Sequence, residues 1–266
     1  MPVGICKLCL QNRKLEDSHL LPSALYRMSR WEGSVNPNPM LISSRGRVQT
    51  SKQIKDYVLC HDCEQRFSRN GERYTMSQVN RKEGFKFLQT LRTSTNMRSA
   101  GGFTFYYETS ALGVDRQKLA YFAMSVFWRA AVHLWHRPEQ KEPMIHLGVY
   151  EEPIRKYLME EAPFPSEMAI LLFVCTDRHA QNVFYQPSQG NMEIPYTWTF
   201  QTRGLNFYLS GIEGMPPQLA GACLVNGAKE IIAARSCEEK ILDATMKIMI
   251  EASKRGNHGP RDTKKL

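Results

Sequence analysis

The 266-residue sequence lacks a long hydrophobic run, since its longest unbroken apolar stretch, Met168–Cys175, has eight residues. A membrane-spanning helix needs about 20, so a membrane partner is not expected. The first residues also lack the charged and then apolar pattern of a secretory signal. These two absences predict a cytoplasmic protein.

The sequence also lacks a glycine-rich phosphate-binding loop, a dinucleotide fingerprint and an internal repeat. Its seven cysteines are odd in number and stand in a chain without a secretory signal. A disulfide framework is therefore not expected, and metal binding or buried thiols are the better interpretation. The hydrophobic content of 42% is enough for a sizeable core and excludes wholesale disorder.

Charge is distributed unevenly along the chain. Residues 1–100 hold 17 lysines and arginines against 8 acidic residues, which accounts for the whole net charge of +9. Such an asymmetry predicts a module that faces a polyanion, attached to a neutral body. The alternative is a basic surface that is merely well solvated.

Four of the cysteines form two C-x-x-C pairs: Cys6, Cys9, Cys60 and Cys63. Four thiolates are the ligand set of a closed tetrahedral zinc site, and each pair suits a tight turn that aims two sulfurs at one metal. The 50 residues between the pairs require an inserted loop or hairpin, which we expect within residues 33–53. His61 lies inside the second pair, and we expect it to be exposed and not a ligand.

The segments 18–22 (SHLLP) and 57–67 (YVLCHDCEQRF) surround these cysteines. They resemble the zinc-stabilised HNH, or ββα-metal, nuclease module, whose pattern is C-x-x-C, then D-H-I-x-P, then L-C-x-x-C-H. The sequence is more similar still to an uncharacterised bacterial group with C-x-L-C, S-H-[IL]-[IL]-P and L-C-x-D-C-E. The resemblance covers residues 6–75, about a quarter of the chain, and implies a zinc-bound treble clef with a ββα-like arrangement.

In that family a histidine deprotonates water, and one divalent metal stabilises the charge on the phosphorane and the leaving oxygen. By position, the resemblance implies His19 as the general base, with Ser18 and Glu64 at positions where the family usually has the metal ligands Asp and His. A carboxylate at Glu64 suits Mg²⁺ or Mn²⁺. The family's asparagine ligand has no counterpart in residues 53–56 (QIKD). Three aspartates stand nearby in the sequence and can compensate for Ser18: Asp17, Asp56 and Asp62.

A series of cations follows the second cysteine pair: Arg66, Arg69, Arg73, Arg81, Lys82, Lys86 and Arg92. In the HNH fold a helix begins near Cys63 and can lie along a nucleic-acid groove. The resemblance therefore implies that several of these cations contact phosphates, with DNA favoured over RNA as the partner. The alternative for each residue is a solvated helix face.

A glycine pair near residue 100 predicts a boundary between a zinc-bound HNH-like module, residues 1–100, and a mixed α+β domain, residues 101–266. In this domain we expect a mostly antiparallel sheet flanked by helices, with Cys175 as a buried, inert thiol. Helices are predicted at 115–136, 154–161 and 237–254, a helix or a helix–strand junction at 84–92, and a basic tail at 256–266. Strands are predicted at 103–107, 168–175, 182–185, 196–201, 205–209, 219–225 and 231–234.

Three functions stay open on these grounds. The first is an HNH-like endonuclease that hydrolyses phosphodiester bonds, a type that the resemblance links to phage defence or mobile elements. The second is a zinc module that binds nucleic acid without cutting it. The third is a zinc-stapled protein-interaction protein. In each case residues 103–266 can bind a ligand, a protein partner or a second copy of the chain.

Overall fold

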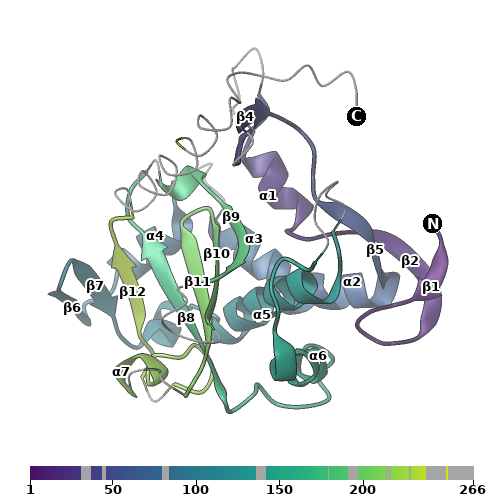
Figure 1. Cartoon of the computed structure of the whole chain (residues 1–266). Coiled ribbons are helices and arrows are strands. Elements are labelled where there is room, and N and C mark those ends of the chain that lie inside the picture. The colour runs from purple at the N-terminus through teal and green to yellow at the C-terminus, as the bar shows by residue number, and fades with distance from the viewer. Residues whose placement is uncertain are drawn as a thin grey trace.

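The computed structural model describes residues 1–30, 37–43, 46–79, 84–135, 142–178, 180–190, 197–213, 215, 217–227, 229–237 and 250. Figure 1 shows a mixed α+β fold. The helix predicted at 237–254 lies outside the described residues except at its first residue and at Ile250, and the tail at 256–266 lies wholly outside them. No described helix has both the length and the apolar character that crossing a membrane requires.

The N-terminal part contains a small antiparallel sheet in the order β1-β2-β5. Its strands are β1 (Val3–Ile5), β2 (Asn12–His19) and β5 (Lys55–Cys60). Helix α1 (Ser23–Met28) and a separate hairpin, β3 (Met40–Ser43) with β4 (Gly46–Gln49), lie between β2 and β5 in the chain. The predicted insertion between the cysteine pairs is thus confirmed as a hairpin.

A continuous helical run follows β5. It consists of α2 (His61–Phe67), the π-helical turn η1 (Ser68–Glu72) and α3 (Arg73–Val79), and α4 (Lys86–Arg92) comes next. Gly71 allows this run to pack closely against the neighbouring helix, because a Cβ at this position would lie only 2.6 Å from the backbone nitrogen of Phe122 on that helix. The missing side chain therefore lets two helix backbones approach closely.

The larger part is built on a seven-stranded sheet in the order β6-β7-β12-β8-β11-β10-β9. All neighbours are antiparallel except β12 and β8, which are parallel, so the predicted mostly antiparallel sheet is confirmed. Its strands are β6 (Met97–Ala100), β7 (Phe103–Tyr106), β8 (Met168–Cys175), β9 (Tyr185–Gln189), β10 (Thr197–Thr202), β11 (Leu205–Gly211) and β12 (Ile232–Arg235).

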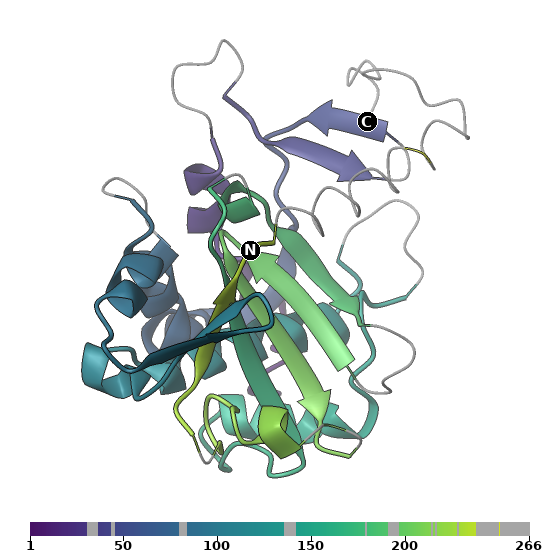
Figure 2. The ribbon, with the colours of Figure 1, turned by 90° about the vertical axis from the view of Figure 1, so that its left-hand side faces the viewer.

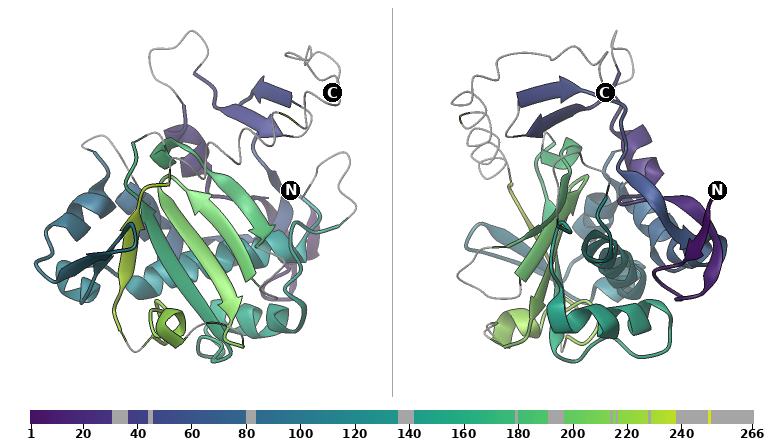
Figure 3. Two further views of the ribbon diagram at one scale, coloured as in Figure 1. Left: turned by 60° about the vertical axis from the view of Figure 1, so that its left-hand side comes forward. Right: turned by 45° about the vertical axis from the view of Figure 1, so that its right-hand side comes forward.

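Helix α5 (Arg116–Val132) lies between this sheet and the N-terminal part, as the right-hand view of Figure 3 shows. Asp115 caps its N-terminus by accepting a hydrogen bond from the backbone N–H of Lys118. On the sheet side, the ring of Phe127 packs 4.9 Å from that of Phe200. The remaining helices and turns are η2 (Thr109–Leu112), η3 (Gly148–Tyr150), α6 (Glu151–Leu158), η4 (Ala180–Asn182) and α7 (Pro217–Ala220).

One hydrophobic core extends through the described chain, from Cys6 and Leu8 in the N-terminal part to Phe207 in the large sheet. Because α5 is buried on nearly all sides, it contributes to the packing of both parts. Strand β6, which ends at Ala100, already belongs to the seven-stranded sheet. A boundary at residue 100 stays a prediction.

Three predictions about the larger part are wrong. Residues 219–225 form the end of α7 and tight turns instead of a strand, because Pro217 suits the first turn of a helix. The strand predicted at 182–185 begins only at Tyr185. Cys175 is not a free thiol but forms a disulfide with Cys237, 62 residues away, a proximity that depends on how the strands pair.

Candidate metal centre and the groups beside it

The four cysteines of the two C-x-x-C pairs meet at one point. Cys6 and Cys9 lie in the tight turn between β1 and β2, where the N–H of Leu10 donates to the carbonyl of Cys6 at 2.9 Å. Cys60 ends β5, and Cys63 lies in the first turn of α2. Their four sulfur atoms all lie within 4.8 Å of one another, so they can hold a metal ion such as zinc.

The geometry of the sulfur atoms suits a tetrahedral ion. Cys9 Sγ and Cys60 Sγ are 3.8 Å apart, and zinc–sulfur bonds of about 2.3 Å give a tetrahedron with edges of about 3.8 Å. A hydrogen bond from Cys63 holds the pKa of the Cys6 thiol down at about 4, whereas the same contact and burial raise the pKa of the Cys63 thiol. Four crowded thiols therefore need a cation before all of them can ionise.

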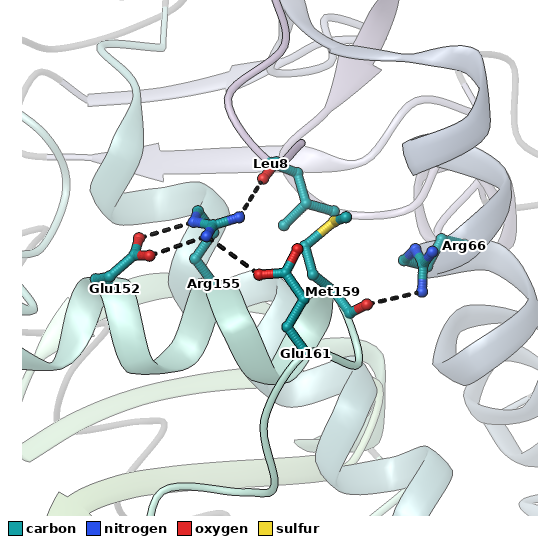
Figure 4. Close-up of polar contacts among 6 residues, drawn as sticks. All are labelled: Leu8, Arg66, Glu152, Arg155, Met159 and Glu161. Atoms are coloured by element: carbon teal, nitrogen blue, oxygen red, sulfur yellow. Dashed lines mark hydrogen bonds and ion pairs between the residues drawn. The ribbon is translucent and has the colours of Figure 1, made fainter. Parts of the chain in front are cut away.

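The turn that carries Cys6 and Cys9 is anchored to the larger part of the protein. Figure 4 shows Arg155 of α6 donating from Nη1 to the carbonyl of Leu8, at 2.9 Å, while Glu152 and Glu161 hold its other nitrogens. Nearby, Arg66 of α2 donates to the carbonyl of Met159 at 3.2 Å. The metal centre is thus closed and fixed against α6, as in a structural site.

Ser18 faces the interior of the small sheet. Its side chain is almost completely buried, with 1% of the residue exposed, and its Oγ accepts a hydrogen bond of 3.1 Å from the N–H of Leu59. The register pairs Ser18 with Asp56 on β5. Its hydroxyl therefore has a structural partner in the strand next to it.

Glu64 lies one residue after the last cysteine and also points inward. Its Oε1 atom is buried and has no hydrogen-bond partner among the described residues. Burial raises the pKa of Glu64, against the opposing effects of the Arg129 guanidinium and the Ser18 hydroxyl. One oxygen of this carboxyl is thus buried, although the residue as a whole is half-buried.

Arg129 of α5 supplies the positive charge at this place. Its side chain is 1% exposed, and Nη2 makes an ion pair of 2.7 Å with Glu72 of η1. Nη1 donates to the backbone carbonyl of His19 at 2.8 Å, and the guanidinium lies 5.2 Å from the ring centre of Phe67. One buried cation therefore ties β2 and η1 to α5 and lies close enough to Glu64 to affect its pKa.

His19 ends β2 and is half-buried beside Tyr26, with ring centres 6.5 Å apart. Burial lowers the pKa of His19, while a hydrogen bond with Gln53 and the charge of Asp17 act in the opposite direction. An imidazole with a lowered pKa is neutral at pH 7 and keeps a lone pair, as a general base requires. Of the three predicted catalytic groups, His19 and Glu64 are half-buried and Ser18 is buried.

The catalytic metal that the HNH resemblance implies does not fit these residues. Such a metal must touch its protein ligands and the scissile phosphate at the same time. Ser18 and Glu64 Oε1 are buried. A metal ion needs at least three Cys, His, Asp or Glu ligand atoms close together. Within the described part of the chain, only the four cysteines form such a group.

The predicted nucleic-acid-contacting cations have different surroundings. Arg66 is paired with Glu160 at the end of α6. Arg69 and Arg73 are exposed along the helical run, with Arg73 donating to the Ser68 hydroxyl at 3.2 Å. Arg81 and Lys82 lie outside the described residues. His61 is exposed, with 69% of its side chain accessible, in agreement with the expectation that it is not a ligand.

Sequence reasoning missed Arg129, Glu72 and His133. His133 follows α5, and its Nε2 lies 2.7 Å from Oδ2 of Asp56, so a second side-chain pair joins α5 to β5. One signal was available: an arginine inside the apolar stretch 126–132 (VFWRAAV) is a charge that must be buried and paired. Its partners, 57 and 110 residues earlier, follow only from the packing.

Comparison with known proteins adds no relative, because no family model, curated protein or solved structure matches the chain.

Proposed function

We propose that the N-terminal part is a zinc-stabilised module that binds nucleic acid without cutting it, and that a buried ion-pair network has replaced its catalytic metal centre. The single observation that carries this proposal is the placement of Arg129. Its guanidinium lies among Glu72, Glu64 and the carbonyl of His19, where it supplies internal positive charge. A buried cation that neutralises the acids removes the need for a metal there.

The arrangement around the cysteines supports the zinc-stabilised part of the proposal. The tight turn with Cys6 and Cys9, the hairpin strands β2 and β5, and the helix that begins at His61 follow one another as in a treble clef. Zinc bound by the four thiolates would contribute folding free energy directly. It would take no part in chemistry, because all four positions are filled by protein.

The charge of the module supports nucleic acid as the partner. All of the chain's net charge of +9 lies within residues 1–100. Arg69 and Arg73 are exposed on one helical run that begins at the metal centre. Cations on such a helix contact phosphates, which favours DNA binding with a strong dependence on salt.

A second candidate is the HNH-like endonuclease, with His19 as its general base. The observation that favours it is the half-buried imidazole with a lowered pKa at the end of β2. Glu64 and Ser18 would have to become accessible to Mg²⁺ or Mn²⁺ when the substrate binds. A role in phage defence or in a mobile element belongs to this candidate.

Two assays on the purified full chain separate these functions. Binding of a labelled DNA duplex is measured by fluorescence anisotropy between 50 and 200 mM salt, for the native chain and for an Arg69→Glu/Arg73→Glu variant. Each lost phosphate contact should lower the slope of log K against log salt by about 0.9. Lys156→Glu/Lys229→Glu, at two exposed lysines of the larger part, also reverses two positive charges and is the charge-matched control.

Cleavage is then measured on plasmid DNA and on RNA with Mg²⁺ or Mn²⁺, using His19→Ala prepared in the same way. The proposal expects salt-dependent binding and no cleavage that depends on His19. Metal-dependent cleavage that is lost in His19→Ala would contradict this proposal and support the endonuclease instead. Absence of salt-dependent binding to any nucleic acid would leave only the protein-interaction function.

A further inference from the structure

The seven-stranded sheet has two faces of different character. Side chains alternate between the two faces along β8, β10 and β11. Those on one face point toward α5 and are buried; Phe200 and Phe207, for example, pack against Phe122 of α5. Those on the other face point away from α5. Figure 2 looks onto this second side, with α5 behind the sheet.

A row of aromatic side chains crosses four neighbouring strands on the side away from α5. Phe103 of β7 is followed by Arg235 of β12, Phe173 of β8 and Tyr208 of β11. The ring centres of Phe103 and Phe173 are 6.0 Å apart, and those of Phe173 and Tyr208 are 5.3 Å apart. Phe105 extends the row, stacked 5.8 Å from Phe103. We call these five residues the aromatic row.

All four rings and Arg235 are half-buried, so part of each ring is exposed to solvent. The smallest neighbour on this side is Ala233, which pairs with both Phe105 and Phe173. A small side chain at that position leaves the aromatic rings as the most prominent groups of the surface. The rings are turned relative to one another, by 56° between Phe103 and Phe173 and by 86° between Phe173 and Tyr208. A flexible ligand can therefore place separate planar groups on different rings, but one rigid stack of groups cannot cover them all.

Arg235 gives the aromatic row its charge. Its guanidinium lies 5.1 Å from the ring centre of Phe103 and 5.6 Å from that of Phe173. No carboxylate among the described residues pairs with it, and its buried Nε has no hydrogen-bond partner there. The positions of this face on β6 to β8 and β10 to β12 carry no Asp or Glu, whereas Arg98 of β6 adds a second, exposed cation.

We propose that the aromatic row is a binding platform for single-stranded nucleic acid, with bases stacking on Phe103, Phe173 and Tyr208 and a backbone phosphate contacting Arg235. Single-stranded nucleic acid offers planar bases and negative charge together. This matches partly exposed rings beside a guanidinium that has no carboxylate partner among the described residues, on strand positions that carry no acid. A purely apolar partner would leave that guanidinium buried without a counter-charge, which is costly.

The platform lies on the far side of α5 from the cysteines and does not depend on the function proposed for the N-terminal module. The two can therefore be tested separately in the same protein. Variants of the aromatic row address the platform, whereas Arg69→Glu/Arg73→Glu addresses the module.

The test measures binding of labelled 12-nucleotide oligouridylate and oligothymidylate to the full chain at several salt concentrations between about 50 and 200 mM. Phe103→Leu and Tyr208→Leu each remove a stacking ring but keep an apolar side chain, and each should weaken binding on the order of 10-fold. Arg235→Met should weaken binding and lower the salt slope by about 0.7. Tyr57→Leu, at a tyrosine of β5 that is 42% exposed, is the matched control and should change nothing.

A second measurement reads stacking directly and does not depend on small changes in affinity. An oligonucleotide that contains 2-aminopurine should lose fluorescence on binding to the native chain and to Arg69→Glu/Arg73→Glu, and should lose less on binding to Tyr208→Leu, which keeps only two of the three stacking rings. Circular dichroism verifies that each variant is folded. The proposal would be overturned by equal affinity of the leucine variants and the native chain. Quenching that is lost only when Arg69 and Arg73 are changed would also overturn it, because binding would then belong to the N-terminal module.

Discussion

Replacing Arg129 with methionine tests the network that we place where a catalytic metal would lie. Methionine keeps an unbranched apolar side chain on α5 but removes the guanidinium. Glu72, whose side chain is 15% exposed, would lose its ion-pair partner at 2.7 Å, and the carbonyl of His19 would lose its donor. Breaking a buried pair in this way leaves an uncompensated charge in the interior.

The expected loss is about 3–5 kcal/mol of unfolding free energy, the usual cost of removing one partner of a buried pair. A whole domain has only about 5–15 kcal/mol of stability, so the variant should be severely destabilised. Arg13→Met is the control. Its ion pair with Asp62 is exposed, with 44% and 72% of the two side chains accessible, and should be worth about 0–1 kcal/mol.

Urea unfolding of the metal-loaded chain, followed by tryptophan fluorescence, measures both variants. Trp128 and Trp135 report on this region, since Trp135 Nε1 donates to the carbonyl of Arg129 at 2.8 Å. Adding Glu72→Gln to Arg129→Met should recover part of the loss, because no unpaired charge then remains. The reasoning would be refuted if Arg129→Met cost no more than Arg13→Met, or if Glu72→Gln gave no recovery.

Four further predictions follow from the same structure. The chain should hold one zinc ion, measured by metal analysis, and Cys6→Ser should lower that content; unchanged zinc in the variant would contradict the four-cysteine site. Burial raises the pKa of Glu64, so the folded state holds this proton more tightly than the unfolded state and stability falls as pH rises through the folded pKa. Glu64→Gln should therefore be more stable than the native chain at pH 7, and the difference should vanish in acid; a loss of bound metal would instead identify Glu64 as a ligand. Gly71→Ala should cost about 1–3 kcal/mol in urea unfolding, because its Cβ would overlap the backbone of α5, and a neutral result would show that the helices can separate. Arg155→Met should speed zinc loss to a chelator, since the turn of Leu8 loses its anchor, and an unchanged rate would make that contact irrelevant to the metal site.

Many elements of the fold could be predicted from local sequence patterns. The apolar segment 168–175 is strand β8 with the same bounds, and the apolar periodicity of 115–136 corresponds to α5 at 116–132. Both depend on side-chain periodicity within one element, which sequence records directly. Residues 219–225 were misassigned as a strand because a short apolar stretch near glycines fits a turn equally well.

The candidate site could be predicted only where ligands are close neighbours in sequence. Each C-x-x-C pair fixes two sulfurs on one turn, so the spacing alone predicts the four-cysteine group that the structure brings together. By contrast, no spacing relates Cys175 to Cys237, and their disulfide follows from the way β8 and β12 pair in the sheet.

The sequence by itself determined the candidate metal ligands, the basic character of the N-terminal part and the mixed α+β class, because each depends on residue type and on spacing over a few positions. Tertiary structure alone decided that Ser18 and one oxygen of Glu64 are buried, and that Arg129 lies near Glu64 from a helix more than 60 residues further along the chain. It also decided that Phe103, Arg235, Phe173 and Tyr208 form one row, since their strands lie in an order that differs from their order in the chain. Exposure and charge pairing arise from packing between distant segments, and no local sequence pattern records them.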